Sequence, residues 1–355
     1  MNSLKKRVVE ESNPTSKTSR LSVAPKKPSN NGLNLARSAK KDEFYTQLDD
    51  IEKELKHYKA HFKGTTVFCN CDDPDESNFW RYFEMNFDHL GLKKLISTHY
   101  HESRPTYKQE LFINSSGQKE FVRTNLEQNG DFRSPESIVI LSESDICVTN
   151  PPFSLFREFV AQLIEMEKQF LVLGSINTVT TKEIFPLIKN KKLWIGQSIR
   201  SGDREFRVPD DYPLQAAGYR VDDEGNKYIR VKGVRWFTNM DYQDRHKDIP
   251  LCCKYYDEPR KYPAFENYNA INVGKVKDIP GDYNGVMGVP ITFIDKYNPE
   301  QFEIIMLANG NARTNTPQDI LEQVAYRQHP KDKGGVGIIN DQRIYARVLI
   351  RRKSL

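Results

Sequence analysis

Apolar residues in the stretch 43–62 recur at spacings of three and four, with polar residues between them. This spacing is typical of the buried face of an amphipathic helix, and Asp42 and Gly64 are suited to begin and end it. The sequence therefore predicts a helix over 43–62. Its apolar face consists of Phe44, Leu48, Ile51, Leu55, Tyr58 and Phe62.

From residue 65 to about residue 197, short apolar runs alternate with helical patterns. The apolar runs predict strands at 65–71, 93–100, 144–150, 169–176 and 192–197. The intervening segments predict helices within 72–91, 155–168 and 180–191, the last with a capping-box pattern from Thr180 to Glu183. This alternation predicts an α/β fold with a mainly parallel sheet and helices on both faces.

Two segments break the alternation. Residues 101–130 are polar and aperiodic, which predicts an insertion or an irregular hairpin. After residue 200 the pattern degrades into short strands and loops rich in Tyr, Asn, Pro and Gly, so a second, less regular region is expected there. A hairpin between 336–340 and 343–352 is predicted to close the chain.

Composition narrows the class of protein. The chain has 355 residues, of which 37% are apolar and 28% charged, enough for a sizeable core. No run of about 18 apolar residues occurs and the N-terminal stretch has no apolar centre, so a cytoplasmic protein without membrane contact is expected. The five cysteines and seven histidines show neither a disulfide framework nor zinc-ligand spacing, so no metal site is predicted.

The positive charge is concentrated at the N-terminus. Residues 1–41 contain ten Lys or Arg and two Glu, a net charge of +8, which leaves −3 of the total +5 for the rest of the chain. With few large apolar residues, this arm is expected to be disordered. It is suited either to contact phosphates through counterion release or merely to solubilise the protein.

The strand predicted at 144–150 ends in a rigid turn, Asn150, Pro151, Pro152 and Phe153. Each proline fixes its own φ and restricts the residue before it, so the turn can hold an amide oxygen, a carbonyl oxygen and an aromatic ring in place. These groups suit methyl transfer to the exocyclic amine of adenine. Two fixed acceptors can accept hydrogen bonds from both N–H groups of the amine, which makes its nitrogen more nucleophilic. Phe153 would then stack on a base flipped out of duplex DNA.

Several segments together carry a family resemblance. They include "DEFYTQLDDIEKEL", "CNCDDPDESNFWRYFEMNFDHLGLKKL", "GDFRSPES", "VTNPPFSLFREF", "RWFTNMD" and "YNAINVGKVKDIPGDYNGVMGVPITF". Over about residues 42–306 the chain resembles the EcoRI-type family of adenine-specific DNA methyltransferases. The resemblance implies a Rossmann-like class I methyltransferase core, S-adenosylmethionine as cofactor and double-stranded DNA as substrate.

The resemblance also implies roles for particular residues. Asn150 to Phe153 would form the catalytic turn. Trp236 and Phe237 are candidates for the opposite wall of the base pocket, with a place in the core as the alternative. Cofactor contacts are expected from Phe44, Tyr45, Thr46, Asp131 and Phe132.

Members of the wider fold usually have a glycine-rich turn after the first strand, where the backbone approaches the cofactor. The corresponding loop here, Cys69 to Asp75, contains no glycine. Asn70, Asp72 and Asp73 are therefore candidates for binding the cofactor's ammonium or ribose. Alternatively, the acidic turn only caps the next helix, whose N-terminus favours carboxylates. Glu102 is a further candidate for the ribose.

The expected organisation is a basic arm at 1–41, a catalytic core at 42–240 and a target-recognition region at 241–355. DNA contacts are expected from 101–130, 198–235 and the C-terminal part. The resemblance suggests GAATTC as the target, protection of DNA against a cognate restriction endonuclease, and a monomer. Alternatives are an enzyme that methylates guanine N2 in RNA or a protein glutamine, and a catalytically silent DNA-binding module.

Other DNA methylation chemistry is only partly excluded. Methylation of cytosine C5 needs a nucleophilic thiolate, typically in a Pro-Cys pair, and the chain has no such pair. Methylation of cytosine N4 uses a similar turn and stays open, although Phe153 favours adenine.

Overall fold

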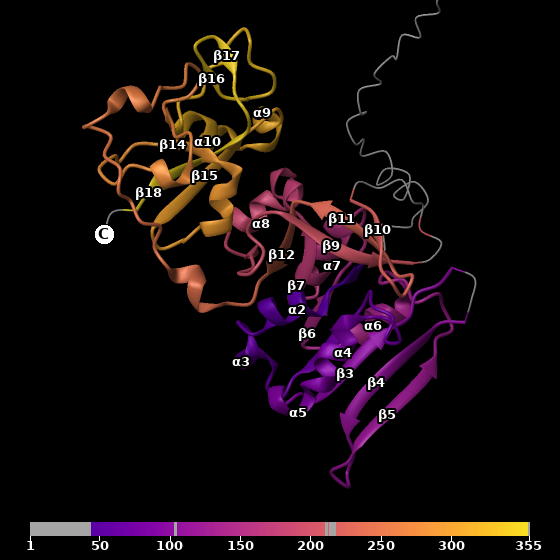
Figure 1. Cartoon of the computed structure of the whole chain (residues 1–355). Helices are drawn as coiled ribbons and strands as arrows, with labels where there is room; N and C mark the ends of the chain where they lie inside the picture. Colours follow the sequence, from indigo (N-terminus) through magenta and orange to yellow (C-terminus); the bar gives the residue numbers. More distant parts are fainter. Residues whose placement is uncertain (1–43, 103–104, 210–211, 213–217, 354–355) are drawn as a thin grey trace, which may run out of the picture.

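The computed structural model describes residues 44–102, 105–209, 212 and 218–353 (Figure 1). The predicted basic arm at 1–41 and the proposed cap Asp42 lie outside these residues. The largest unit is an eight-stranded sheet in the order β5-β4-β3-β2-β6-β7-β12-β8. Its strands are β2 (Thr66–Cys69), β3 (Lys94–Thr98), β4 (Tyr107–Ile113), β5 (Lys119–Asn125), β6 (Ile146–Thr149), β7 (Gln169–Ser175), β8 (Trp194–Ile195) and β12 (Val234–Thr238).

The sheet is mixed, with a parallel centre. Strands β3, β2, β6 and β7 pair in parallel, while β4, β5, β12 and β8 add antiparallel strands at the two sides. The central strands are continuous apolar runs, as expected of strands covered on both faces. The prediction of a mainly parallel sheet therefore holds for the centre and not for the edges.

Within the polar segment 101–130, where an insertion or an irregular hairpin was predicted, β4 and β5 form a regular hairpin. Strands β4 and β5 pair along their whole lengths, and β4 extends the main sheet by pairing with β3. Most side chains of β5 are exposed, because it is the edge strand. Polar residues on both faces removed the apolar pattern by which such a strand is normally recognised.

The single helix predicted over 43–62 is wrong. The segment contains β1 (Tyr45–Thr46), α2 (Leu48–Leu55) and α3 (Lys59–Phe62). Tyr45 and Thr46 pair with β9, so this long-range partner overrides the helical pattern at its start. The predicted apolar face is nevertheless buried at Phe44, Ile51, Leu55, Tyr58 and Phe62.

Helices cover both faces of the main sheet. On one face lie α2, α3, α4 (Asn78–Met85) and α5 (Phe87–Leu90); on the other lie α6 (Pro135–Glu143), α7 (Phe156–Glu165) and α8 (Phe185–Lys189). The predicted capping box is absent, because Thr180 ends the 3-10 helix η1 (Ile176–Thr180) and α8 begins only at Phe185. No helix among the described residues is both long and apolar enough to cross a membrane.

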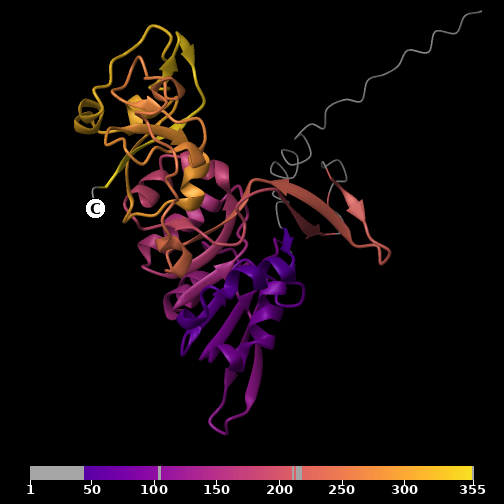
Figure 2. The ribbon, with the colours of Figure 1, turned by 60° about the vertical axis from the view of Figure 1, so that its left-hand side comes forward.

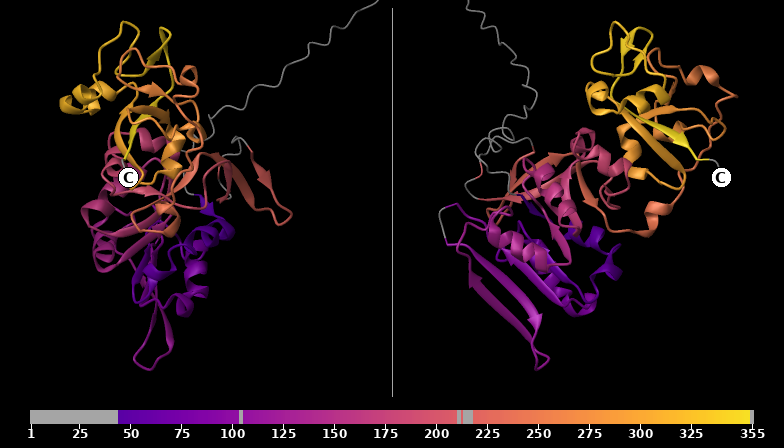
Figure 3. Two further views of the ribbon diagram at one scale, coloured as in Figure 1. Left: turned by 90° about the vertical axis from the view of Figure 1, so that its left-hand side faces the viewer. Right: turned by 180° about the vertical axis from the view of Figure 1, so that it is seen from behind.

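A second sheet, in the order β13-β14-β18-β15, lies at the opposite end of the molecule from the β4–β5 hairpin (Figures 1 and 3). Its hydrophobic residues are divided between the core cluster of α6, α7 and α8 and a separate cluster that includes α9 and α10. Its strands are β13 (Ile271–Asn272), β14 (Met287–Pro290), β15 (Phe302–Ala308) and β18 (Arg347–Arg352). This region also contains α9 (Ala312–Asn315), α10 (Gln318–Gln323), η2 (Gln243–His246), η3 (Pro259–Lys261), η4 (Val276–Asp278) and η5 (Ile291–Lys296).

The predicted closing hairpin forms only in part. Strand β16 (Ile338–Ile339) pairs with β17 (Gln342–Arg343), but β18 pairs instead with β14 and β15. The long final strand therefore completes a sheet whose other members lie far away in sequence.

A third sheet, in the order β1-β9-β11-β10, projects from the body of the molecule (Figure 2). One of its faces packs on the core through Phe206, Val208, Ile229 and Val231. Its remaining strands are β9 (Asp203–Val208), β10 (Arg220–Val221) and β11 (Lys227–Lys232).

Candidate active site

The strand order reverses between β2 and β6. From β2 the chain moves outward to β3 on one side and later returns to β6 on the other, so the connections diverge at this point. In open α/β sheets, ligands bind beyond the carboxyl ends of such strands. The loop after β2 and the turn Asn150–Phe153 after β6 therefore meet, and the Cys71 N–H donates to Thr149 Oγ1 at 3.0 Å.

Asp72 joins the loop to the turn. Its buried carboxylate accepts hydrogen bonds from the hydroxyls of Ser77, at 2.8 Å, and Thr149, and from the backbone of Asn150. Burial raises the pKa of Asp72 from 3.8 to about 6, although these hydrogen bonds act in the opposite direction. The cap of α4 is Ser77, whose hydroxyl accepts from the Phe79 N–H at 3.0 Å, so Asp72 only supports the cap.

Asp73 has different partners from Asp72. It accepts a hydrogen bond from the Tyr107 hydroxyl at 2.9 Å, and His99 Nε2 lies 3.6 Å from its other oxygen. His99 also stacks on Tyr107, with ring centroids 5.0 Å apart. The β4–β5 hairpin thus contacts the loop after β2 through Tyr107, a contact that the sequence pattern did not indicate.

Asn150 is held in one orientation. Its side chain is buried, and Nδ2 donates to the carbonyl oxygen of Phe44 at 2.5 Å. Its Oδ1 is also buried and has no hydrogen-bond partner among the described residues. The Leu155 N–H donates to the Pro152 carbonyl at 2.9 Å, which closes the turn. The turn therefore holds the amide oxygen of Asn150 with its acceptor capacity unused.

Phe153 is half-buried beside Asn150, and two rings support it. Phe44 lies at 5.7 Å between ring centroids with an interplanar angle of 84°, and Phe206 at 6.4 Å with an angle of 87°. Both are edge-to-face arrangements, which fix the Phe153 ring. The local sequence around Phe206 does not indicate this role, because its place here depends on the pairing of β9 with β1.

Further unsatisfied polar atoms gather at the same strand ends. Asn70, which follows β2, is buried, and neither its Oδ1 nor its Nδ2 has a hydrogen-bond partner among the described residues. The hydroxyl oxygen of Thr46 in β1 is also buried and has no partner among these residues. Buried polar atoms normally have partners, so such atoms beside the turn are suited to a polar ligand. Tyr45, next to Thr46, is partly exposed, whereas Phe44 is buried.

Asp131 and Phe132 lie by the end of β3. Gly130 has φ +74°, and a Cβ there would lie 2.3 Å from the His99 carbonyl oxygen, so the close approach requires glycine. Asp131 accepts from Arg133 Nε at 2.8 Å. Phe132 is buried against Phe159, with centroids 5.0 Å apart. Glu102, a candidate for the ribose together with Asn70, Asp72 and Asp73, accepts a hydrogen bond from the Tyr100 hydroxyl at 3.4 Å.

Comparison with known proteins settles the family. The model of the family described as "Adenine-specific methyltransferase EcoRI" matches residues 32–353. The chain belongs to this family. It is therefore an adenine-specific DNA methyltransferase, as the sequence resemblance predicted.

Three relatives of this methyltransferase, all named type II methyltransferases, support the assignment. M.EcoRI of Escherichia coli is 48% identical over 291 residues, which cover 78% of this chain and 89% of that relative. M.MpnI of Mycoplasma pneumoniae is 41% identical over 91% of this chain and 98% of its own length. M.MgeORF184P of Mycoplasma genitalium is 39% identical over 91% of this chain and 99% of its own length. No solved structure matches the methyltransferase.

The placement of Trp236 and Phe237 corrects their expected role in the base pocket. Both are fully buried in β12, where Trp236 packs on Phe79 and Phe237 packs on Phe156. Strand β12 lies between β7 and β8 and is covered on both faces, so neither ring can form the wall of an open pocket. In the methyltransferase, Phe44 and Phe206 surround Phe153 instead.

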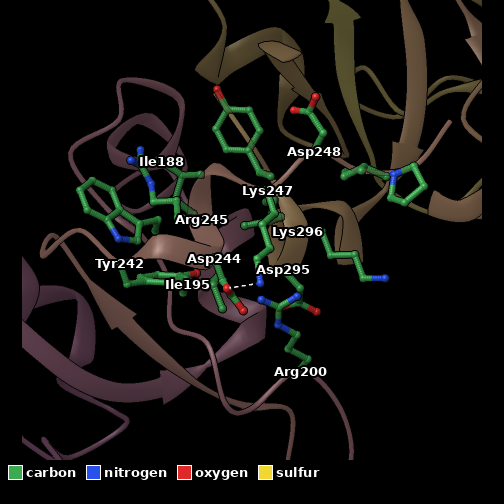
Figure 4. A pocket seen from close by; sticks show the side chains of 15 residues that line it. Ile188, Ile195, Arg200, Tyr242, Asp244, Arg245, Lys247, Asp248, Asp295 and Lys296 are labelled. Carbon is green, nitrogen blue, oxygen red and sulfur yellow. Dashed lines mark hydrogen bonds and ion pairs between the residues drawn. The ribbon is translucent and has the colours of Figure 1, made fainter. Parts of the chain in front are cut away.

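A cavity of about 210 Å³ lies apart from the turn Asn150–Phe153, between β8, η2 and η5 (Figure 4). Its charged lining is largely balanced, since Lys247 pairs with Asp244 and Asp295 pairs with Arg235. None of the predicted site residues lines it. Elsewhere, the side chains of Glu266, His329 and Asp341 converge, but Lys331 already pairs with Asp341, and His329 lies 3.3 Å from Glu266.

Proposed function

We propose that this methyltransferase transfers a methyl group to N6 of an adenine flipped out of duplex DNA, at the turn Asn150–Phe153. The observation that carries the proposal is the state of Asn150. Its amide nitrogen is anchored on Phe44, while its buried oxygen has no partner among the described residues. A buried acceptor left without a partner at the carboxyl end of a central strand is suited to an incoming N–H group.

The chemistry follows from the adenine amine. Its lone pair is delocalised into the ring, so the free amine is a poor nucleophile. The nitrogen becomes more nucleophilic when its two hydrogens are donated to hydrogen-bond acceptors. Asn150 Oδ1 would accept one N6 hydrogen and the Pro151 carbonyl the other. Because both oxygens are fixed before the base arrives, they need little reorganisation during reaction. The supported ring of Phe153 would stack on the base.

S-adenosylmethionine fits the polar atoms beside the turn. When bound, it supplies an electrophilic methyl group on a sulfonium centre. The unpartnered Asn70 and Thr46 atoms would bind its polar groups, and the Asp72 and Asp73 carboxylates would favour its ammonium or ribose hydroxyls. Phe44 and Tyr45 would contact its methionine end, with Asp131 and Phe132 at its adenine.

We assign residues 42–240 to a Rossmann-like class I methyltransferase core and 241–355 to target recognition. The reversal of strand order between β2 and β6 supports the first assignment. GAATTC is the target that the resemblance implies. Action as a monomer that protects DNA from a cognate restriction endonuclease belongs to the same proposal.

Purified protein with methyl-labelled S-adenosylmethionine tests the proposal. Label should enter duplex DNA and not ribosomal RNA or release factor, and nucleoside analysis should find N6-methyladenine. Methylation-sensitive sequencing of the product would give the target sequence. Label in N4-methylcytosine, or none in DNA, would contradict the proposed chemistry.

A further inference from the structure

The projecting sheet β1-β9-β11-β10 carries a row of alternating aromatic and guanidinium side chains on its exposed face. Strand register places Tyr45 opposite Arg207, Arg207 opposite Tyr228 and Tyr228 opposite Arg220. Arg207 lies 5.5 Å from the ring centroid of Tyr45, and Arg220 lies 4.0 Å from that of Tyr228. The row therefore forms one continuous surface across all four strands.

The row begins at the catalytic turn. Tyr45 follows Phe44, whose carbonyl oxygen holds Asn150, and Arg207 donates to Glu76, near the start of α4, at 2.5 Å. At the usual strand spacing the row extends about 14 Å outward, roughly the length of four base pairs. DNA with one base in the catalytic turn would have its next few base pairs within reach of this sheet.

Further cations lie beside the row on the same face. Arg230 pairs across the strands with Glu205, and Lys232 pairs with Asp203. The Arg230 side chain is 62% exposed, and its Nε lies 3.9 Å from Glu205. Glu205 also accepts from Arg220 at 2.5 Å, so one carboxylate is shared by two guanidinium groups. The strands thus present four cations and two anions on this face, while Glu76 and Asp222, outside the strands, pair with Arg207 and the Tyr228 hydroxyl. The face is rich in guanidinium groups that can exchange these carboxylates for phosphates.

We propose that this face of the projecting sheet binds the phosphate backbone of the duplex that flanks the target adenine. The inference rests on the proposed function, since it supposes that the turn receives a base from duplex DNA. Arginines contact phosphates without reading sequence, and tyrosine hydroxyls contribute similar contacts. The other face of the sheet packs on the core, so the row has a fixed position relative to the turn.

Opposite charge changes provide the test. Arg220→Ala and Arg230→Ala should weaken binding several-fold, to a similar extent for a labelled GAATTC duplex and for a scrambled duplex. Each should also lower the slope of log affinity against log salt by about 0.9, as expected for one lost phosphate contact. Glu205→Gln should strengthen binding, because it removes the charge that offsets both arginines. Fluorescence anisotropy over a salt series measures all of these effects.

A pair outside the segments expected to contact DNA offers a matched control. Arg157, on α7, and Glu183, before α8, lie with their charged atoms 3.4 Å apart at the surface. Arg157→Ala and Glu183→Gln change the net charge by the same amounts as the test variants, and both should leave affinity and salt slope unchanged. Urea unfolding of each variant verifies that the fold is intact.

Two outcomes would overturn the inference. One is wild-type affinity and salt slope in both arginine variants; the other is a changed methylated sequence, which would mean that this face reads bases. Wild-type methylation measured alongside keeps the proposals distinguishable. If the wild-type protein methylates duplex DNA and the arginine variants bind normally, only the assignment of this surface fails.

Discussion

Asn150→Ala removes two separate interactions of one amide group. The first is the buried Oδ1, which has no partner among the described residues and is proposed to accept an N6 hydrogen. The second is the hydrogen bond from Nδ2 to the Phe44 carbonyl, at 2.5 Å. The substitution should therefore lower both the rate of methyl transfer and the free energy of unfolding, for different reasons.

The two effects differ in size. Loss of one preorganised hydrogen-bonding group at a reacting centre typically lowers kcat by about 10²–10³, or about 3–4 kcal/mol in barrier height. Loss of the donor to a buried carbonyl leaves that oxygen unsatisfied, which costs about 1–3 kcal/mol of stability. Asn150→Ala should show both losses.

Asn150→Asp separates the two effects. It keeps an acceptor oxygen but removes the donor, and it places a carboxylate against the Phe44 carbonyl. This variant should unfold at least as easily as Asn150→Ala and yet retain more of its activity. Single-turnover methyl transfer and urea unfolding measure the two quantities. A folded Asn150→Ala protein that transfers methyl groups within about threefold of the wild-type rate would refute the reasoning, since the expected loss is about a hundredfold or more.

Three further predictions follow from the structure. Burial raises the folded-state pKa of Asp72 from 3.8 to about 6, so the folded protein holds this proton more tightly than the unfolded chain. The Asp72 carboxyl therefore lowers the free energy of unfolding as pH rises from about 4 to about 6. Relative to wild type, Asp72→Asn should gain up to about 3 kcal/mol of stability across this pH range. Urea unfolding at several pH values measures the difference. Phe153→Ala should make extrusion of the target base less favourable by about 1–3 kcal/mol, because the stacking contact is lost. With 2-aminopurine at the target position, the fluorescence increase on binding should be smaller for Phe153→Ala, and Phe153→Trp should restore the increase. Arg235→Ala should cost about 3–5 kcal/mol of stability, because it leaves Asp295 buried and unpaired. The double replacement Arg235→Met with Asp295→Leu should recover most of this loss, and urea unfolding measures both variants.

Local sequence was sufficient to predict the central strands and the turn Asn150–Phe153. Strands β2, β3, β6 and β7 are short apolar runs buried on both faces, a pattern visible without knowledge of their neighbours. The Asn-Pro-Pro-Phe turn was recognisable because the prolines restrict its backbone wherever they occur. The family resemblance added the chemistry, and comparison with known proteins confirmed the family.

Only the tertiary structure decided which groups surround the turn. Phe206 supports Phe153 because β9 pairs with β1, and the Asn150 amide is oriented by a carbonyl 106 residues away in sequence. Trp236 and Phe237 are core residues for the same kind of reason, since β12 inserts between β7 and β8. Residue type and spacing determine which local conformations a segment favours, but the contacts of a side chain depend on long-range pairing, which leaves little local trace.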